Sequence, residues 1–228
     1  MDRRRVRGRA GTVPLAVGPE LALTAAVRTV HRLVEQQAAL KRDDPALVFY
    51  EPDVASAFRR KESRLSYRDL NARANAVARR LIAGGFRRGD LAVIALPPSL
   101  ELAVAELAVL KAGGAYACPV SRLAYTVATP LSVLRDGVAH GIDILSVPAD
   151  AAAACPNLPV LVRDEDPACV LADAAGALTI SFSHRAIVDA ARTPSTAWDA
   201  NGAPYAHWAA LMAGETFRIA SLPLDRAA

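Results

Sequence analysis

Short apolar runs alternate with longer helical segments in the middle of this chain, and this alternation is the feature that most constrains its fold. Residues 91–96 form an unbroken apolar run, LAVIAL. A nearly all-apolar segment follows at 100–112, and after Gly113-Gly114 a second apolar run begins. Parallel strands that are buried on both faces and joined by helical crossovers produce this pattern. The sequence therefore predicts an α/β fold with a mainly parallel sheet flanked by helices.

The same reasoning places the individual elements. We expect strands at 91–96, 115–118, 142–147 and 178–182, and helices near 67–83, 100–112 and 184–192. A helix at 29–40, a strand at 46–50 and short strands at 158–162 and 169–171 complete the prediction. Ser66 and Ser183 are predicted N-caps, because a serine hydroxyl can accept a free N–H of the first helical turn. The charged segment 51–64 is expected to be a surface loop or hairpin, and residues 193–216 show no periodicity.

The net charge of the chain is concentrated at its N-terminus. The 228 residues carry a formal charge of +4, and the first ten residues, with five arginines and one aspartate, account for all of it. We divide the chain into a basic, flexible arm at 1–26 and one folded unit at 27–228. A basic arm could contact phosphates, but terminal segments are commonly solvated. No function is assigned to the arm, and no nucleic-acid partner is expected.

The cysteines and histidines form no disulfide or metal-binding pattern. The three cysteines are widely spaced in apolar surroundings, at Cys118, Cys155 and Cys169. Free thiols of this kind are typical of a reducing compartment, so we expect a cytoplasmic protein. The histidines lack ligand spacing to Asp, Glu or Cys, and no metal site is expected; they are His31, His140, His184 and His207. No run reaches the roughly 18 apolar residues of a membrane span, so no membrane association is expected.

Two motifs of the sequence resemble core motifs of one enzyme family. The first is LSYRDL at 65–70, and the second is LKAGGAY at 110–116, which leads to Pro119. Together they resemble the adenylate-forming, AMP-binding superfamily, and most closely the N-terminal part of an amino-acid adenylation domain of nonribosomal peptide synthetases. Shorter stretches at 183–187 and 220–225 are similar to later parts of that family. The resemblance implies that residues 27–228 form the first part of the large N-terminal subdomain.

The resemblance also shows where a phosphate loop would lie and how this chain departs from it. In the family, a Ser/Thr/Gly-rich loop ending in Pro-Lys-Gly precedes the segment that matches 183–187. Here residues 172–179 read ADAAGALT, with one glycine, one hydroxyl, a carboxylate at Asp173 and no lysine. A phosphate-binding turn needs several converging backbone amides and usually a cation. We therefore expect a plain strand connection, and the alternative is a weak, degenerate phosphate site at Gly176 and Thr179.

Lysines are rare in this chain, and none stands where the family's chemistry would need one. The chain contains only Lys41, Lys61 and Lys111. Lys111 falls in the last turn of a predicted helix, where a cation complements the helix dipole, so its expected role is structural. The resemblance matches Asp225 to the aspartate that holds the α-amino group of an amino-acid substrate. The alternative interpretation of Asp225 is a solvated carboxylate near the C-terminus.

The motifs point to two functional hypotheses. The first is a truncated, catalytically silent adenylation-domain homologue, a pseudoenzyme, because the family's adenine, ribose and hinge motifs would follow residue 228. It needs no cofactor, has no catalytic residues, and is expected to use a protein partner or self-association to cover an exposed sheet edge. The alternative is one half of an ATP-dependent acid–AMP ligase that another polypeptide completes. That ligase would use ATP and Mg²⁺ to activate an amino acid or another carboxylic acid.

Overall fold

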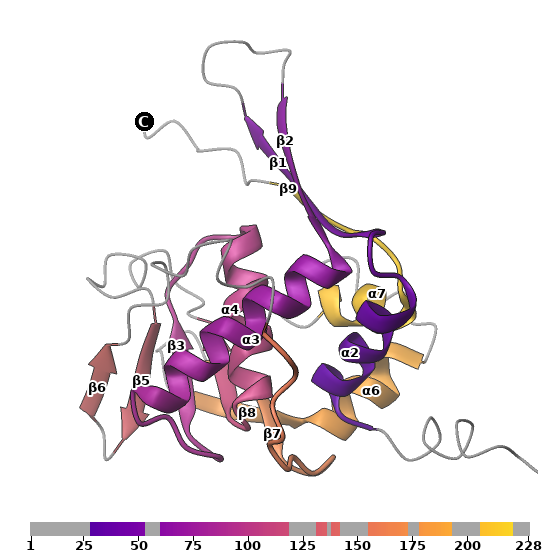
Figure 1. The fold of residues 1–228 in the computed structure, drawn as a ribbon. Coiled ribbons are helices and arrows are strands. Elements are labelled where there is room, and N and C mark those ends of the chain that lie inside the picture. The colour runs from indigo at the N-terminus through magenta and orange to yellow at the C-terminus, as the bar shows by residue number, and fades with distance from the viewer. Residues whose placement is uncertain are drawn as a thin grey trace, which may run out of the picture.

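The structure is a computed structural model, and it contains two β-sheets and five helices among its described residues. It describes residues 28–52, 60–118, 131–135, 138–141, 155–172, 178–192 and 206–220. In chain order the elements are α2 (Val30–Leu40), β1 (Pro45–Pro52), β2 (Arg60–Ser66), α3 (Tyr67–Ala83), β3 (Leu91–Ile94), α4 (Leu100–Lys111), β4 (Ala115–Cys118), β5 (Leu131–Arg135), β6 (Val138–Gly141), β7 (Pro167–Ala172), β8 (Leu178–Ser183), α6 (His184–Arg192), α7 (Ala206–Ala213) and β9 (Phe217–Ala220) (Figure 1).

The larger sheet has the strand order β6-β5-β3-β4-β7-β8. Its centre is parallel, since β3 pairs with β4 and β4 with β7 in that sense, for example Leu91 with Ala115. Its outer strands are antiparallel: β5 to β3, β6 to β5, and β8 to β7. The α/β class is confirmed, and within the described strands of this larger sheet the predicted parallel pairing is confined to β3, β4 and β7. The predicted strand at 142–147 lies outside the described residues.

The smaller sheet has the order β2-β1-β9 and projects from the body of the molecule (Figure 1). β1 and β2 pair antiparallel from Pro45 opposite Ser66 to Pro52 opposite Arg60. This pairing decides between the two alternatives left open for 51–64, because β2 makes that segment part of a hairpin. β9 joins β1 in parallel, with Leu47 opposite Phe217. The C-terminal part of the described chain is thereby attached to one of its first elements.

The predicted helices are confirmed, and their serine caps form as expected. Ser66 Oγ accepts the N–H of Asp69 at 3.1 Å, and Ser183 Oγ accepts the N–H of Ala186 at 3.2 Å. Ser99 caps α4 in the same way, at 3.1 Å from the N–H of Leu102. Each serine satisfies a backbone donor that the first helical turn leaves free.

Three segments differ from the sequence prediction, and for the first two the residues give a physical reason. Residues 158–162 are not a strand. Pro156 and Pro159 flank Leu158 and remove backbone donors that a sheet ladder requires. The helix α7 lies inside the stretch without periodicity; its sequence AHWAALMA is apolar nearly all round, so it carries no stripe that a periodicity argument could detect. The short hairpin of β5 and β6 was also not predicted.

The turn between α4 and β4 depends on two glycines. Gly113 has φ +86°, a conformation that residues with a side chain rarely adopt. A Cβ on Gly114 would collide with the ring of Phe86 and lie 2.6 Å from the carbonyl oxygen of Asp90. The second motif therefore fixes how closely the end of α4 approaches the start of the sheet.

Tyr67 of the first motif contacts the C-terminal end of α7. Helix C-termini leave carbonyl oxygens without partners inside the helix. Here side chains of α2 and α3 and of the turn after α2 contact them: Tyr67 Oη lies 3.1 Å from the carbonyl oxygen of Leu211, Gln37 Nε2 3.1 Å from that of Met212, and Lys41 Nζ 2.7 Å from that of Gly214. Lys41 is thereby engaged in a structural contact.

Replacing Gly114 by alanine is expected to lower the free energy of unfolding by about 3 kcal/mol, because the new Cβ overlaps backbone and ring atoms. Gly89→Ala is the matched control: its φ is +87°, but a Cβ there meets nothing within 4 Å. The backbone conformation alone costs about 1 kcal/mol there. Urea unfolding followed by fluorescence measures both. Equal losses for the two variants would contradict the close-packing argument.

Candidate functional site

The parallel strands β3, β4 and β7 define two different edges of the larger sheet. Their carboxyl ends are Ile94, Cys118 and Ala172, and their amino ends are Leu91, Ala115 and Pro167. Open α/β sheets bind ligands in the crevice outside the carboxyl ends of their strands. The carboxyl edge is therefore the candidate nucleotide edge.

The degenerate phosphate-loop position lies at this carboxyl edge. β7 ends at Ala172, β8 begins at Leu178, and these two residues pair with each other. The register passes from Leu171 opposite Ile180 to Ala172 opposite Leu178, which leaves Thr179 at a bulge in β8. Gly176 and the side chain of Thr179 lie outside the described residues. The connection joins two paired antiparallel strands, and only 173–177 separate them.

The N-terminus of α6 does not reach the carboxyl edge. Because β8 is antiparallel to β7, Ser183 lies opposite Pro167, at the amino end of β7. The first N–H groups of α6 are already engaged: that of His184 with the Asp166 carbonyl at 3.1 Å and that of Arg185 with the Asp164 carbonyl at 2.8 Å. A helix N-terminus binds an anion through free N–H groups. The start of α6 therefore serves chain packing, in agreement with the capping role predicted for Ser183.

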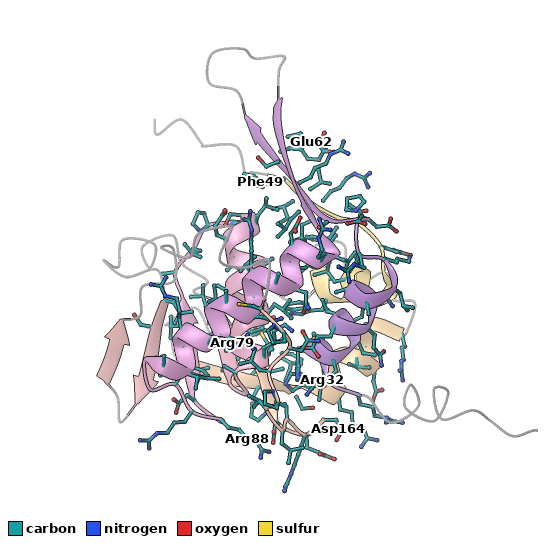
Figure 2. All side chains as sticks on the ribbon, in the orientation of Figure 1. Arg32, Phe49, Glu62, Arg79, Arg88 and Asp164 are labelled. Atoms are coloured by element: carbon teal, nitrogen blue, oxygen red, sulfur yellow. The ribbon has the colours of Figure 1, made fainter. Side chains whose placement is uncertain are left out.

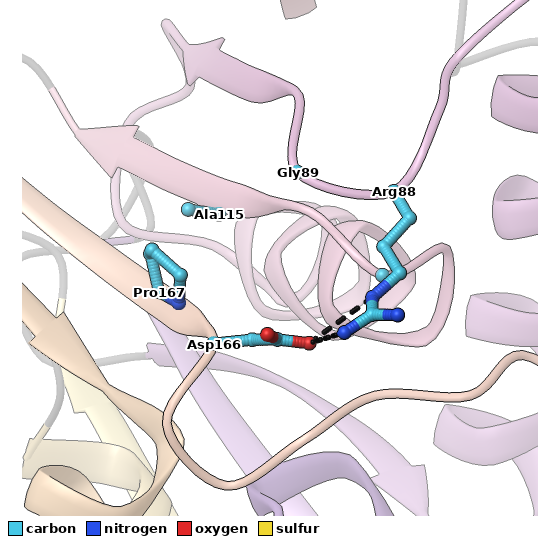
Figure 3. A pocket seen from close by; sticks show the side chains of 6 residues that line it. Arg88, Gly89, Ala115, Asp166 and Pro167 are labelled. Carbon is cyan, nitrogen blue, oxygen red and sulfur yellow. Dashed lines mark hydrogen bonds and ion pairs between the residues drawn. The ribbon is translucent and has the colours of Figure 1, made fainter.

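A shallow pocket of about 330 Å³ lies at the amino edge, opposite the nucleotide edge. Its lining is Arg88, Gly89, Gly113, Ala115, Asp166 and Pro167. In Figure 3 the Arg88 guanidinium points at the Asp166 carboxylate, and Arg88 Nη2 lies 2.7 Å from Asp166 Oδ2.

The charges of this pocket neutralise each other. Burial on its own raises the pKa of Asp166, but the N–H of Arg163 and the guanidinium of Arg88 outweigh it, so the pKa lies below its ordinary value. A cation already paired with a carboxylate has little attraction left for a phosphate. The ion pair instead links the segment before β7 to the turn before β3.

Lys111 has a structural role, with a partner that its sequence position did not reveal. Its side chain is fully buried and forms an ion pair with Glu35 of α2. Arg32 also contacts Glu35, at 2.8 Å, and Asn157 Oδ1 lies 3.4 Å from Lys111 Nζ. Burial lowers the pKa of Lys111 to about 8, although the Glu35 carboxylate opposes this shift. Because α4 ends where β4 begins, this ammonium lies at the amino edge, away from the phosphate-loop position.

The segment 155–158 is held against α3 by further polar contacts. Arg79, which Figure 2 labels on α3, donates through Nη2 to the Pro156 carbonyl at 2.8 Å. Asn75 Nδ2 donates to the Cys155 carbonyl at 2.9 Å. These contacts and the Lys111 ion pair form one polar network between α2, α3, α4 and the segment before β7. Sequence reasoning missed it, because the partners that connect different elements lie 46 to 80 positions apart.

The histidines also make contacts that no spacing could indicate. His31 and His184 pack edge to face, with ring centroids 5.5 Å apart. His207 Nε2 lies 2.8 Å from Glu106 Oε2. Within the described ranges, no three His, Cys, Asp or Glu side chains are grouped as metal ligands would be.

The remaining sequence candidates are placed only in part. Asp225 and the arm at 1–26 lie outside the described residues, as does the side chain of Cys118. Cys169 is buried and Cys155 is partly exposed. Burial raises the pKa of Cys169 to about 12, so this thiol stays protonated. The helices that the structure describes are too short or too polar to cross a bilayer.

A comparison with known protein families shows which family the two core motifs resemble. The model of the AMP-binding enzyme family matches residues 34–126, which include both motifs and the Lys111–Glu35 pair. Residues 34–126 are therefore similar to the AMP-binding enzyme family. A relative of the chain is bacitracin synthase 1 of Bacillus licheniformis, with 36% identity over 124 residues. That match covers 51% of this chain and 2% of the relative, so the chain spans only a small part of that protein's length.

The fold likeness extends well beyond residues 34–126. A fatty acyl-adenylate ligase from L. pneumophila has a TM-score of 0.66 and 15% identity, over 86% of this chain and 40% of that structure. The N-terminal subdomain of NpsA from Klebsiella oxytoca has a TM-score of 0.60 and 21% identity, over 87% of this chain and 55% of that one. The chain therefore has the fold of part of the N-terminal subdomain of adenylate-forming enzymes, and the predicted resemblance is confirmed.

The buried ion pair predicts an asymmetric response to substitution. Glu35→Leu leaves the Lys111 ammonium buried without its carboxylate and is expected to cost about 3 kcal/mol of unfolding free energy. The double variant Glu35→Leu with Lys111→Met replaces the pair by apolar groups and is expected to recover most of that loss. Urea unfolding of the single and double variants tests this. Losses that simply add would show that the two side chains do not interact.

Proposed function

We propose that this chain is a catalytically silent adenylation-domain homologue, a pseudoenzyme that keeps the scaffold of an adenylate-forming ligase and serves as an interaction partner. By itself it would form no acyl-adenylate and require no cofactor. A cytoplasmic location and a protein partner or second copy are parts of the same proposal. The similarity of residues 34–126 to the AMP-binding enzyme family and the shared fold support this scaffold.

The observation that carries the proposal is the connection between β7 and β8. It stands at the carboxyl edge of the sheet, yet 173–177 read DAAGA, with one glycine and one carboxylate and no cation. A triphosphate needs several converging amides and a positive charge to offset its own. Lys41 and Lys111 are both engaged elsewhere, with Gly214 and Glu35 respectively. Lys61 belongs to β2 of the smaller sheet.

The retained scaffold supports a second candidate function. The acyl-adenylate ligase that shares this fold was solved with acyl adenylate and pyrophosphate bound. A second polypeptide carrying the remaining motifs could complete such a site on this chain, with ATP and Mg²⁺ as cofactors. In that case Gly176 and Thr179 would contact a phosphate, and Asp225 would hold the amino group of an amino-acid substrate.

The isolated chain is expected to bind Mg²⁺-ATP with a dissociation constant above about 1 mM. A dissociation constant of about 1 mM corresponds to about 4 kcal/mol of binding free energy. It is also expected to show no amino-acid-dependent exchange of pyrophosphate into ATP. Calorimetry and an exchange assay across the amino acids measure these two properties. Saturable exchange by this chain alone would contradict catalytic silence.

A matched variant tests whether the connection between β7 and β8 is the cause. Replacing 173–177 by a longer Gly/Ser/Thr-rich sequence ending in Pro-Lys-Gly is expected to strengthen ATP binding without producing exchange. Unchanged affinity in a folded variant would show that another part of the chain limits binding. Exchange that appears only when the product of the neighbouring gene is added would support the second candidate function. Light scattering of the same samples tests self-association.

A further inference from the structure

The N-terminus of α2 is capped by a side chain from a distant part of the chain. Thr29 occupies the N-cap position, but its side chain makes no capping hydrogen bond. Instead the N–H of Val30, the first residue of α2, donates to His184 Nδ1 at 3.2 Å. The two residues are 154 positions apart, and both are fully buried. The first residue of α6 therefore supplies the acceptor that the Thr29 side chain does not.

This contact specifies the protonation state of His184. An imidazole nitrogen that accepts an N–H must carry a lone pair, so Nδ1 is unprotonated and the neutral ring bears its proton on Nε2. That Nε2, together with Nδ1 of His31, is buried without a hydrogen-bond partner among the described residues. The two rings pack edge to face at 5.5 Å. Neither ring has a carboxylate within ion-pair distance in the described residues that would compensate a positive charge.

Burial is the largest factor that opposes protonation of both rings. The charges that act on His31 are those of Arg32 on α2 and Lys111 on α4, and those that act on His184 are Asp164 and Asp166 before β7. The elements packed around the two rings also carry Glu35 on α2, His207 on α7, and Arg185 and Asp189 on α6 itself. Burial lowers the pKa of His184 to about 4, although Asp166 and Asp164 raise it. Burial, then His184, Lys111 and Arg32, hold the pKa of His31 well below its ordinary value.

We propose that His184 is an acid-released latch between α2 and α6. As a neutral ring it accepts the Val30 N–H and fixes the starts of the two helices to each other. When a proton binds Nδ1, that nitrogen becomes a donor that faces another donor, and the cation lies at the positive end of the α2 dipole. The contact breaks and α2 separates from α6. This device does not depend on the proposed function.

The direction of the pH effect follows from the depressed pKa. A histidine that titrates lower in the folded than in the unfolded chain contributes stability above its unfolded pKa of about 6.5. That contribution is lost as the pH falls toward the folded pKa of about 4. Between pH 7.5 and pH 5.0, His184 alone should lower the folding equilibrium constant on the order of 30-fold.

The variant His184→Asn separates capping from titration. The asparagine oxygen can accept the Val30 N–H in place of Nδ1, but it cannot be protonated in this range. We expect the ratio of the wild-type to the variant folding constant to fall on the order of 30-fold from pH 7.5 to pH 5.0. Using the ratio removes the titrations that both proteins share. A ratio that stays constant over this range would overturn the latch.

A second variant keeps the proposal testable if the His184→Asn substitution prevents folding. Val30→Pro removes the donated N–H and exchanges one buried apolar side chain for another, and proline is well tolerated at the first helical position. Thr29, with φ −102° and ψ 137°, already has a conformation allowed before proline. Because the neutral ring loses its hydrogen bond, the pKa of His184 should rise, as NMR titration of the ring carbons and ¹⁵N shifts can measure. An unchanged titration of His184 in Val30→Pro would contradict the proposed contact.

Discussion

The burial of α4 on nearly every side is the constraint on which the rest of the structure depends. Ten of its twelve residues are buried, including both of its charged residues beyond the first turn. A charge in the interior needs a partner, since an unpaired buried ion costs several kcal/mol. Lys111 finds Glu35 on α2, and Glu106 lies next to His207 on α7. The positions of α2 and α7 around α4 are therefore set by charge as well as by apolar packing.

The same network controls how the chain returns to the larger sheet. The segment before β7 is held by Asn75, Arg79 and Lys111 along its first residues and by Arg88 near its end. β7 can then pair in parallel with β4, and its far end carries the connection to β8. The scaffold at the amino edge of the sheet is thus densely connected. The carboxyl edge, where a nucleotide would bind, carries the sequence that departs from the family.

The local elements could be predicted from the sequence, and the long-range contacts could not. The serine caps, the helices α3 and α4 and the glycine turn follow from residues close to each other, such as Ser66 and Gly113-Gly114. The position of Lys111 in the last turn of a helix predicts a structural role, but its partner Glu35 lies 76 positions away. The pairing of Val30 with His184 has no local signal for the same reason. Helix α7 is apolar nearly all round and therefore shows no helical periodicity in the sequence. The apolar run around Leu158 predicts a strand, but the two nearby prolines prevent one.

The central claim is that this scaffold binds no triphosphate at the carboxyl edge of its sheet. The most direct test is an NMR titration of the ¹⁵N-labelled chain with Mg²⁺-ATP at millimolar concentrations. A dissociation constant of about 1 mM corresponds to about 4 kcal/mol of binding free energy. The account predicts no saturable shift of the amides of Ile94, Ala172 and Leu178, which mark that edge. Saturable shifts of these amides at micromolar ATP would contradict it.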